Sequence, residues 1–279
     1  MKKFDIVVGN PPYQRSAKEG GNGKRDLWDK FVPLCFKLCN ANSFVCLIHP
    51  SKWRKPNHPL WNLLKNKLKY LYIASKKEGK KVFGAITRFD WYIATEKDRD
   101  NECEISDELR GQHTIKLNDL PFLPNYNFEQ LLNLLAKDNE EKCEVIYSSF
   151  LYDGRKKWMS RSKNSEYLFP CVYGMYKNNK IKFLYSKDNK GHFGVPKVII
   201  SCGEHPYPFI DIKGEYGICN NAFAIKVSDI KEAELIKEAL ESKSFSDILK
   251  ATKWGNFQIE WKMFQFFKKD FWKSFVEDK

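Results

Sequence analysis

The sequence lacks the cysteine and histidine patterns that hold metal ions or disulfide scaffolds. Its eight cysteines include no C-x-x-C pair, and its five histidines form no ligand framework beside them. A zinc site needs ligands at characteristic spacings, and a small disulfide fold needs regularly placed cysteines, so the sequence predicts neither. We therefore expect a chain with reduced thiols and no bound metal.

Long apolar runs and a leader sequence are also missing. No apolar stretch approaches the about 20 residues that a membrane-spanning helix needs. The amino-terminal MKKFDIVVGNPPY runs directly into a proline-containing motif, so neither a signal peptide nor a membrane anchor is indicated. No paired acidic and lysine cluster of the nuclease type stands out. We expect a cytoplasmic protein that does not associate with membranes.

Acidic residues are too few to balance the basic ones. The chain has 48 lysines and arginines against 35 aspartates and glutamates, a formal net charge of +13. Such a surplus attracts phosphate groups in a salt-dependent way, and several basic clusters are interleaved with aromatic residues, as in surfaces that grip nucleic acid. We expect contacts to a nucleic acid, mainly to its phosphates, from Lys52, Arg54, Lys55, Arg155, Lys156, Lys157, Arg161 and Lys163.

The most informative motif follows the first apolar run. Residues 4–9, FDIVVG, are typical of a strand, and Asn10-Pro11-Pro12-Tyr13 follows directly. The two prolines fix φ and donate no hydrogen bond, so this loop is stiff and its carbonyls stay free. The Asn10 amide oxygen and the Pro11 carbonyl can accept hydrogen bonds from one amino group, while the Tyr13 ring stacks on a planar substrate. The motif predicts a site for a planar amine.

The residues after this motif favour an α/β domain. The expected elements are a helix over 26–38, a strand over 43–48, a helix over 60–68, strands over 70–75 and 89–95, and a basic turn at 76–84. A strand, helix, strand order of this kind is that of half a doubly wound sheet. The strand over 43–48 is continuously apolar, which is typical of a buried parallel strand.

The segment FDIVVGNPPY resembles motif IV of the amino-methyltransferases that use S-adenosylmethionine, especially the DNA adenine-N6 methyltransferases of the Eco57I and TaqI type. Residues 81–89, KVFGAITRF, look like motif VIII of that family, in which a phenylalanine stacks on the extruded adenine. The resemblance implies that Tyr13 and Phe83 hold the base between them, with Phe89 as the alternative to Phe83. It is specific up to motif VIII and only architectural beyond it.

The resemblance also implies an activity, that of a site-specific adenine DNA methyltransferase (EC 2.1.1.72) of a restriction-modification system. A methyl group would pass from S-adenosylmethionine directly to N6 of a base extruded from double-stranded DNA. Asn10 and the Pro11 carbonyl would hold the amino hydrogens, and Pro12 would stiffen the loop. Asp5 stands at the start of the strand, where we expect it to make a structural bond rather than act as a general base.

The sequence departs from the family pattern in one respect. The glycine-spaced motif I, which holds the cofactor, should lie some tens of residues before motif IV, but only nine residues precede Asn10. We expect a partial Rossmann-like methyltransferase domain, whose cofactor-binding half comes from a second polypeptide carrying motif I or from a homodimer. The cofactor-binding residues are therefore not assigned. Without that half, the strand over 4–9 should leave apolar surface uncovered.

The composition changes along the chain and predicts two domains. We place the catalytic part at residues 1–97, a charged linker at 98–120, and an α+β target-recognition domain that binds DNA at 121–279. The expected elements of the last region are a helix over 128–135, strands over 145–152, 180–185, 195–201 and 216–227, and helices over 229–240 and 245–249. We expect the aromatic residues of the tail after residue 257 to form a packed core.

Three alternatives remain open from the sequence. Release-factor glutamine methyltransferases share the tetrapeptide, but they lack a large basic domain like the one predicted here after residue 121. Cytosine-N4 methylation uses the same amino chemistry, and Asn rather than Ser at position 10 favours adenine. The third alternative is a non-catalytic DNA-binding remnant, or the specificity part of a split methyltransferase.

Overall fold

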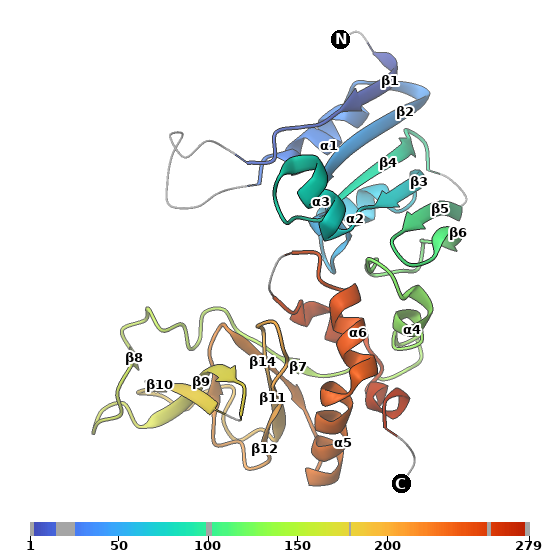
Figure 1. The fold of residues 1–279 in the computed structure, drawn as a ribbon. Coiled ribbons are helices and arrows are strands. Elements are labelled where there is room, and N and C mark those ends of the chain that lie inside the picture. The colour runs from blue at the N-terminus through green and yellow to red at the C-terminus, as the bar shows by residue number, and fades with distance from the viewer. Residues whose placement is uncertain (1–2, 15–25, 99–101, 179, 256–257, 277–279) are drawn as a thin grey trace. The chain divides into compact units, whose positions relative to one another are not determined.

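The computed structural model describes residues 3–14, 26–98, 102–178, 180–255 and 258–276. The chain divides into two compact units (Figure 1). Unit 1 is Met1–Phe128 with Trp254–Asn256, and unit 2 is Glu129–Lys253 with Phe257–Lys279. Among the described residues, no helix combines the length and the apolar character that crossing a membrane requires.

Within the described residues, unit 1 is built on a six-stranded sheet in the order β1-β2-β4-β3-β5-β6. Its strands are β1 (Phe4–Gly9), β2 (Cys39–Pro50), β3 (Leu68–Ile73), β4 (Phe89–Thr95), β5 (Glu102–Asp107) and β6 (Gly111–Lys116). β1 runs parallel to β2, and β3 runs parallel to β5, while the other neighbours are antiparallel. The sheet is therefore mixed, as α/β folds with antiparallel additions commonly are.

Three helices and a short 3-10 turn connect these strands in the described part of unit 1. They are α1 (Trp28–Lys37), η2 (Ser51–Arg54), α2 (Pro59–Leu64) and α3 (Lys76–Phe83). The expected helices over 26–38 and 60–68 are confirmed as α1 and α2, with shorter bounds. The expected strands over 43–48, 70–75 and 89–95 are confirmed as β2, β3 and β4, with other bounds for β2 and β3. β2 is not the buried parallel strand that we expected, because it is parallel to β1 but antiparallel to β4 and its buried residues alternate with less buried ones.

The segment 76–84, which we expected to be a turn, is helix α3. Its amino terminus has a complete capping box, in which the Ser75 hydroxyl accepts from the Glu78 backbone N–H and the Glu78 carboxylate accepts from the Ser75 N–H. Gly84 ends the helix in the left-handed conformation at φ 68°. The S-x-x-E signature was present in the sequence. We expected a turn because the segment is rich in lysine and glycine.

Replacing Ser75 with Ala should lower the free energy of unfolding by about 1 kcal/mol, because the cap is lost and backbone donors of α3 remain unpaired. Urea unfolding of the two proteins measures this difference. Ser75→Thr serves as the control, since threonine keeps the accepting hydroxyl and should retain most of the stability. Equal losses from both substitutions would contradict a capping role.

Residues 98–120 differ from the expected linker, because β5 and β6 lie there. In β5 the buried residues Cys103, Ile105 and Asp107 alternate with Glu102, Glu104 and Ser106, which are not buried. When hydropathy is averaged over neighbouring residues, a strand with one charged face has a polar mean. Only the alternation of apolar and polar residues indicates the strand. The boundary between the compact units accordingly follows Phe128.

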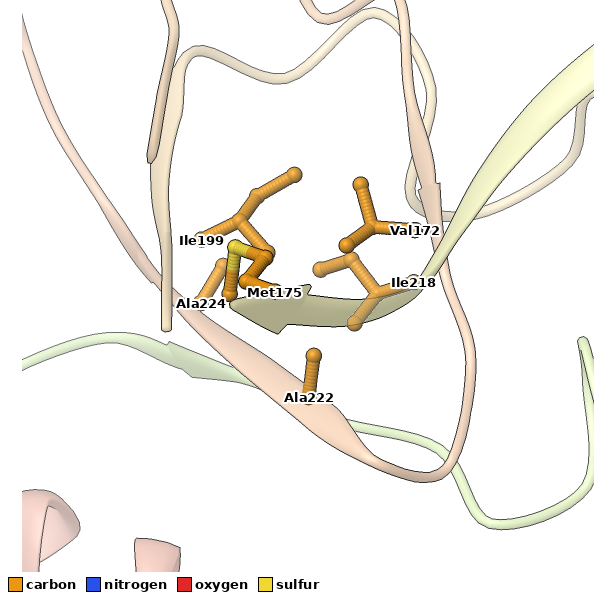
Figure 2. Packing of buried hydrophobic residues seen from close by; sticks show 6 residues of the cluster. All are labelled: Val172, Met175, Ile199, Ile218, Ala222 and Ala224. Atoms are coloured by element: carbon orange, nitrogen blue, oxygen red, sulfur yellow. The ribbon is translucent and has the colours of Figure 1, made fainter. Parts of the chain in front are cut away.

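Unit 2 contains two four-stranded sheets among the residues that the structure describes, in the orders β13-β9-β10-β8 and β12-β11-β14-β7. The strands are β7 (Val145–Ile146), β8 (Met159–Ser160), β9 (Phe169–Tyr176), β10 (Lys180–Ser186), β11 (Lys197–Ser201), β12 (Phe209–Asp211), β13 (Gly217–Ile218) and β14 (Ala222–Lys226). Buried residues from both sheets meet in one apolar cluster (Figure 2), which consists of Val172, Met175, Ile199, Ile218, Ala222 and Ala224. The predicted α+β character of this region is confirmed.

The rest of unit 2 is mainly helical. Helix α4 (Phe128–Leu132) begins at the boundary between the two units. The later helices are α5 (Ile230–Glu241) and α6 (Lys243–Ala251), followed by the 3-10 turns η3 (Trp261–Phe266) and η4 (Phe271–Ser274). The tail aromatics form a packed core, as expected. Phe264 and Phe267 are fully buried and their ring centroids lie 5.2 Å apart. Phe271 packs 5.7 Å from Phe267.

Two expected strands of unit 2 are shorter than the sequence suggested. The run over 145–152 contributes only the two residues of β7, and the run over 216–227 is divided into β13 and β14. The division is a tight turn, in which the Ala222 N–H donates to the Cys219 carbonyl at 3.1 Å. Asn220 and Asn221 are the central residues of this turn, and asparagine is a common turn residue.

Candidate active site and nucleic-acid interface

The Asn10-Pro11-Pro12-Tyr13 loop lies at the carboxyl end of β1. Because β1 is parallel to β2, this loop and the end of β2 lie at the same edge of the sheet. β4 begins at that edge and β3 ends there, since Phe89 pairs with Pro50 and Asp90 pairs with Ile73. The carboxyl edge of an open α/β sheet is where ligands commonly bind. Segments far apart in sequence therefore meet at one candidate site.

The aromatic residues selected from the sequence come together at this edge. The Tyr13 and Phe83 ring centroids lie 5.9 Å apart at an interplanar angle of 65°. Phe89, the alternative residue, packs edge-to-face on Phe83 at 5.0 Å. The three rings form one cluster, which we call the aromatic cluster. Since Tyr13 and Phe83 touch each other directly, their rings must separate before a planar base can stand between them.

The polar part of the loop is accessible. Asn10 is exposed, and its side chain makes no hydrogen bond to the residues that the structure describes. The Tyr13 carbonyl accepts from the Leu27 N–H at 3.1 Å, which ties the loop to the start of α1. Burial raises the pKa of the Tyr13 phenol to about 12, so the ring stays neutral near pH 7. The site offers a free amide acceptor beside a neutral aromatic face.

A buried histidine supports the sheet edge behind the loop. His49 is fully buried, and its ring stacks on Trp28 with centroids 4.6 Å apart. Its Nδ1 lies 3.1 Å from the Pro50 carbonyl and its Nε2 lies 3.1 Å from the Tyr92 hydroxyl. Burial lowers the pKa of His49 to about 4. A neutral ring fits these partners, with Nδ1 donating to the carbonyl and Nε2 accepting from the hydroxyl.

This histidine should make the protein sensitive to acid. The pKa of His49 falls from an ordinary 6.5 to about 4, so the native state binds fewer protons than the unfolded chain below pH 6.5. Stability is therefore complete above pH 6.5 and falls as the pH decreases towards 4. Burial lowers the pKa of His58 and His192 to about 4 too, which adds to the trend. Urea unfolding of wild type and His49→Gln at pH 7 and pH 5 tests this, and the variant should lose less stability. Equal losses would contradict the assignment.

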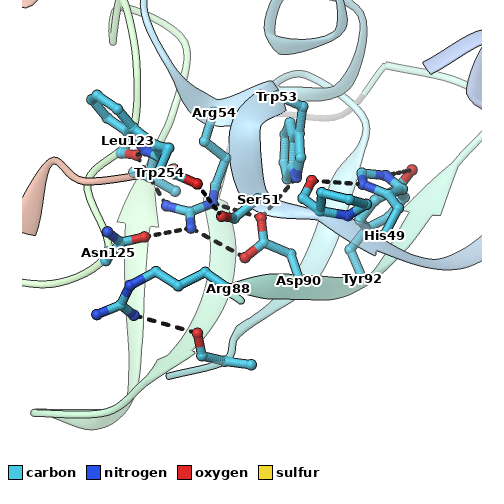
Figure 3. Close-up of polar contacts among 12 residues, drawn as sticks. His49, Ser51, Trp53, Arg54, Arg88, Asp90, Tyr92, Leu123, Asn125 and Trp254 are labelled. Carbon is cyan, nitrogen blue, oxygen red and sulfur yellow. Dashed lines mark hydrogen bonds and ion pairs between the residues drawn. The ribbon is translucent and has the colours of Figure 1, made fainter. Parts of the chain in front are cut away.

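Arg54, which we expected to contact DNA, lies in the core of unit 1 (Figure 3). Its side chain is fully buried, and its Nε donates to the Asp90 carboxylate at 2.7 Å. The remaining donors bind the Leu123 and Pro124 carbonyls at 3.0 and 2.6 Å and the Asn125 amide oxygen at 2.8 Å. Each donor nitrogen of Arg54 already has an acceptor inside unit 1, so the side chain is not available to DNA. The expected contact between Arg54 and DNA is therefore wrong.

The Arg54 network also includes Trp53, whose Nε1 donates to Asp90 at 2.7 Å. Trp254 closes the same region, since its Nε1 donates to the Leu123 carbonyl at 2.7 Å. The neighbouring Lys52 is exposed and lies 3.7 Å from the Asp26 carboxylate, while Lys55 is half-buried. Basic residues next to each other in sequence therefore have different environments, because the 3-10 turn η2 buries Ser51, Trp53 and Arg54 and leaves Lys52 exposed.

The basic residues expected from unit 2 are largely at the surface. Arg155 is exposed but makes a bidentate pair with Asp153, with its Nη2 2.6 Å from the carboxylate. Lys156 Nζ lies 3.5 Å from the centroid of the Phe150 ring. Lys157, Arg161 and Lys163 are exposed and make no side-chain bond to the described residues. These three cations remain available to an anionic ligand.

The edge strand β1 exposes apolar side chains. Phe4, Ile6 and Val8 point to one face and are 46, 62 and 75% exposed. Among the residues that the structure describes, β1 has a neighbouring strand on one side only, which is β2. Asp5 accepts a hydrogen bond from the Asn40 amide at 2.8 Å, which is the structural role expected for it. The uncovered apolar surface expected at residues 4–9 is therefore present.

Known proteins resemble the amino-terminal part of this chain in sequence. Residues 1–83 match the family model described as Eco57I restriction-modification methylase. A stretch of 71 residues is 36% identical to a protein of Mycoplasma pneumoniae described as an uncharacterized adenine-specific methylase. That stretch is 25% of this chain and only 16% of the relative, so the chain spans a small part of the relative's length.

A solved structure extends the likeness in fold beyond the family match. The Type IIL restriction-modification enzyme MmeI, solved in complex with DNA, aligns with 94% of this chain at a TM-score of 0.50 and 12% identity. The alignment covers 45% of the MmeI chain. At this identity the likeness concerns the fold alone. The resemblance inferred from FDIVVGNPPY is thus confirmed, and residues 1–83 carry the sequence pattern of the Eco57I restriction-modification methylases.

Proposed function

We propose that this chain is the catalytic and DNA-binding part of a site-specific DNA methyltransferase of a restriction-modification system, which methylates adenine at N6. The observation that carries the proposal is the meeting of the Asn10-Pro11-Pro12-Tyr13 loop with Phe83 at one sheet edge. The family match over residues 1–83 and the relative described as an adenine-specific methylase support it. The net charge of +13 suits a DNA partner.

The loop residues suit the positioning of an exocyclic amine. The Asn10 amide oxygen and the Pro11 carbonyl accept the two amino hydrogens, which turns the nitrogen lone pair out of conjugation and towards the methyl donor. S-adenosylmethionine supplies the electrophilic methyl group when it is bound. With the cofactor bound, the N–C bond would form as the sulfonium S–C bond broke, and the surplus proton on nitrogen would pass to water. Asn10 fits this role because it is exposed and has no hydrogen-bonding partner among the described residues.

The aromatic cluster suits a clamp for an extruded base. In this proposal Tyr13 and Phe83 separate, and the base enters between their faces. The cost of parting the two rings is modest, since an aromatic pair contributes about 0.5–1.5 kcal/mol beyond its buried area. Stacking on a base restores a similar interaction, at about 1–3 kcal/mol per base. The contact seen here is therefore a closed state that a base can replace.

Replacing Phe83 with Leu should weaken base extrusion about 10-fold, because leucine keeps the apolar volume but loses the stacking face. The measurement is the fluorescence of 2-aminopurine placed at the target adenine, which rises when the base leaves the stack. Phe89→Leu is the matched variant and should have the smaller effect. A larger effect from Phe89→Leu would transfer the role to the alternative residue.

The exposed edge at β1 suits a protein partner. A parallel strand with uncovered apolar side chains is unusual, since parallel sheets are normally covered on both faces. In this proposal a polypeptide that carries the cofactor-binding motif, or a second copy of the chain, covers Phe4, Ile6 and Val8. Wild type should self-associate when purified alone, and Val8→Lys should reduce this. A monomeric wild type in analytical ultracentrifugation at high concentration would contradict this part of the proposal.

The function is tested in the organism that encodes the chain, where any partner is present. Deleting the coding sequence should remove methylated adenine from one recurrent DNA sequence, and restoring the chain should bring it back. Methylation is mapped by single-molecule sequencing, and the modified base is identified by mass spectrometry of digested DNA. An unchanged methylation map would refute the proposal. Loss of N4-methylcytosine instead would favour the cytosine alternative.

A further inference from the structure

We infer that a hollow in unit 2 reads the DNA sequence, with Asn220 and Asn221 binding base edges and with Arg161 and Lys182 binding the backbone. The inference deepens the proposed function and rests on it for the identity of the ligand. Of these residues, only Arg161 was selected from the sequence. Lys182, Asn220 and Asn221 were not selected as site residues, because strands that are distant in sequence form their surroundings.

The hollow has a volume of about 410 Å³, and its walls combine cations, amides, the Asp153 carboxylate and two aromatic rings. The polar residues that line it include Arg155, Arg161, Lys182, Asn220 and Asn221, together with Tyr173. Tyr173 and Asn221 also line a neighbouring hollow of about 530 Å³, which contains His205 and Gln258. The two hollows therefore meet at Tyr173 and Asn221. A strand bound across them would pass over the amides.

The turn that presents the two asparagines is rigid. The Ala222 N–H donates to the Cys219 carbonyl at 3.1 Å, and the Asn221 carbonyl accepts from the Cys202 N–H at 2.9 Å. Ile218, Cys219, Ala222 and Phe223, which flank the turn, are fully buried. A side chain on such a frame is held ready for its ligand, which lowers the entropy lost on binding.

The side-chain amides on this turn are available. Asn220 is half-buried and Asn221 is exposed, and neither amide makes a hydrogen bond to the part of the chain that the structure describes. An asparagine amide presents one acceptor and two donors, and it pairs in a bidentate manner with N6 and N7 of adenine in the major groove. Two unpaired amides side by side in a hollow with basic walls match the edges of bases.

A β-bulge directs Tyr173 and Lys182 towards the same hollow. Val172 pairs with Phe183 and Gly174 pairs with Lys182, so Tyr173 is the extra residue between them. Lys182 Nζ lies 5.4 Å from the centroid of the Tyr173 ring. Bulges commonly redirect side chains next to functional sites. This one brings the exposed Lys182 to the hollow of about 410 Å³ and the Tyr173 ring to the wall that the two hollows share.

The free positive charge of the hollow comes from two residues. Arg155 is already neutralised by its bidentate pair with Asp153. Arg161 and Lys182 are both exposed, and Lys182 contacts the Tyr173 ring rather than a carboxylate. Cations without a paired anion attract phosphate, whereas uncharged amides discriminate between bases. In the hollow, Arg161 and Lys182 thus bind the DNA backbone, whereas the turn with Asn220 and Asn221 binds the edges of bases.

The test compares the DNA sequences that are enriched when each protein binds a library of random duplexes. Wild type should enrich one motif. Asn220→Ala and Asn221→Ala should each lose about 10- to 100-fold of the preference at one position of that motif. Arg161→Gln and Lys182→Gln should weaken binding to all sequences and reduce the slope of log affinity against log salt by about 1. Lys231→Gln, an exposed lysine on α5 that lines neither hollow, is the control and should leave the motif unchanged.

The outcomes separate this inference from the proposed function. A wild-type motif that both asparagine variants retain would overturn the inference while leaving DNA binding intact. Binding without any motif in wild type would also overturn it. Absence of salt-dependent binding to any duplex would refute the proposed function itself. Circular dichroism and thermal unfolding of each variant ensure that a lost preference reflects the turn and not an unfolded unit.

Discussion

Replacing Asn10 with Ala should lower DNA methylation at least about 100-fold, which is the usual cost of losing one preorganised hydrogen-bonding group at a reacting centre. The amide oxygen orients the amino nitrogen in the proposed mechanism, and alanine leaves that hydrogen unbound. Asn10 is exposed and forms no hydrogen bond within the described part of the chain, so the substitution should leave the stability unchanged. A catalytic loss without a structural loss is the expected signature.

The measurement is the fraction of methylated target adenines in the native organism carrying the Asn10→Ala substitution. Salt-dependent DNA binding of the purified variant should equal that of wild type, since Asn10 belongs to the catalytic loop and not to the basic surface. Gln14→Ala, an exposed amide that follows the loop, is the matched control and should retain methylation. Full methylation by Asn10→Ala would remove the catalytic assignment and favour the non-catalytic alternative.

Replacing Asp90 with Ala should destabilise unit 1 by about 3–5 kcal/mol, the usual cost of leaving one partner of a buried ion pair uncompensated. Arg54 and Asp90 are both fully buried, and Asp90 also accepts from Trp53. Without the carboxylate, the guanidinium remains in an apolar interior with its charge unpaired. The two carbonyls and the amide that it also contacts are neutral and compensate only in part.

Urea unfolding of wild type, Asp90→Ala, Arg54→Met and the double variant measures this coupling. The double variant should be more stable than Asp90→Ala alone, because it removes the unpaired charge together with its partner. Lys52→Met at the exposed neighbouring position is the control and should change stability by less than about 0.5 kcal/mol. Additive effects of the two core substitutions would show that the pair is not coupled.

Much of unit 1 could be predicted because its signals are local. The strand over 4–9, the stiff loop after it, the helices α1 and α2 and the strands β2, β3 and β4 follow from hydrophobic periodicity and prolines, which act within a few residues. The aromatic pair is different. The residue types of Tyr13 and Phe83 pointed to stacking, but their contact depends on β1, β2 and β4 ending or beginning at one edge.

The basic residues show where sequence reasoning fails. Lys52, Arg54 and Lys55 form one cluster in the sequence, yet Arg54 is fully buried and Lys52 is exposed. Burial of a charge is decided by whether distant groups, here Asp90 and the carbonyls near Leu123, are placed to satisfy it. No local window contains those partners. The same holds for β5, whose charged face suggested a linker, while its other face is buried in unit 1.

By itself, the sequence determined which functional groups the loop after the first strand carries. These are an amide, carbonyls and an aromatic ring on a stiff backbone, in a strongly basic chain. Proline geometry, side-chain functional groups and net charge are properties of the residues and need no tertiary context. Tertiary structure alone decided which groups meet and which remain free. Pairing between distant strands brought Tyr13 to Phe83 and buried Arg54. It also left the Asn220 and Asn221 amides, on a hydrogen-bonded turn, without a hydrogen bond to the described residues. Contacts and desolvation depend on residues far apart in sequence, which only the folded chain brings together.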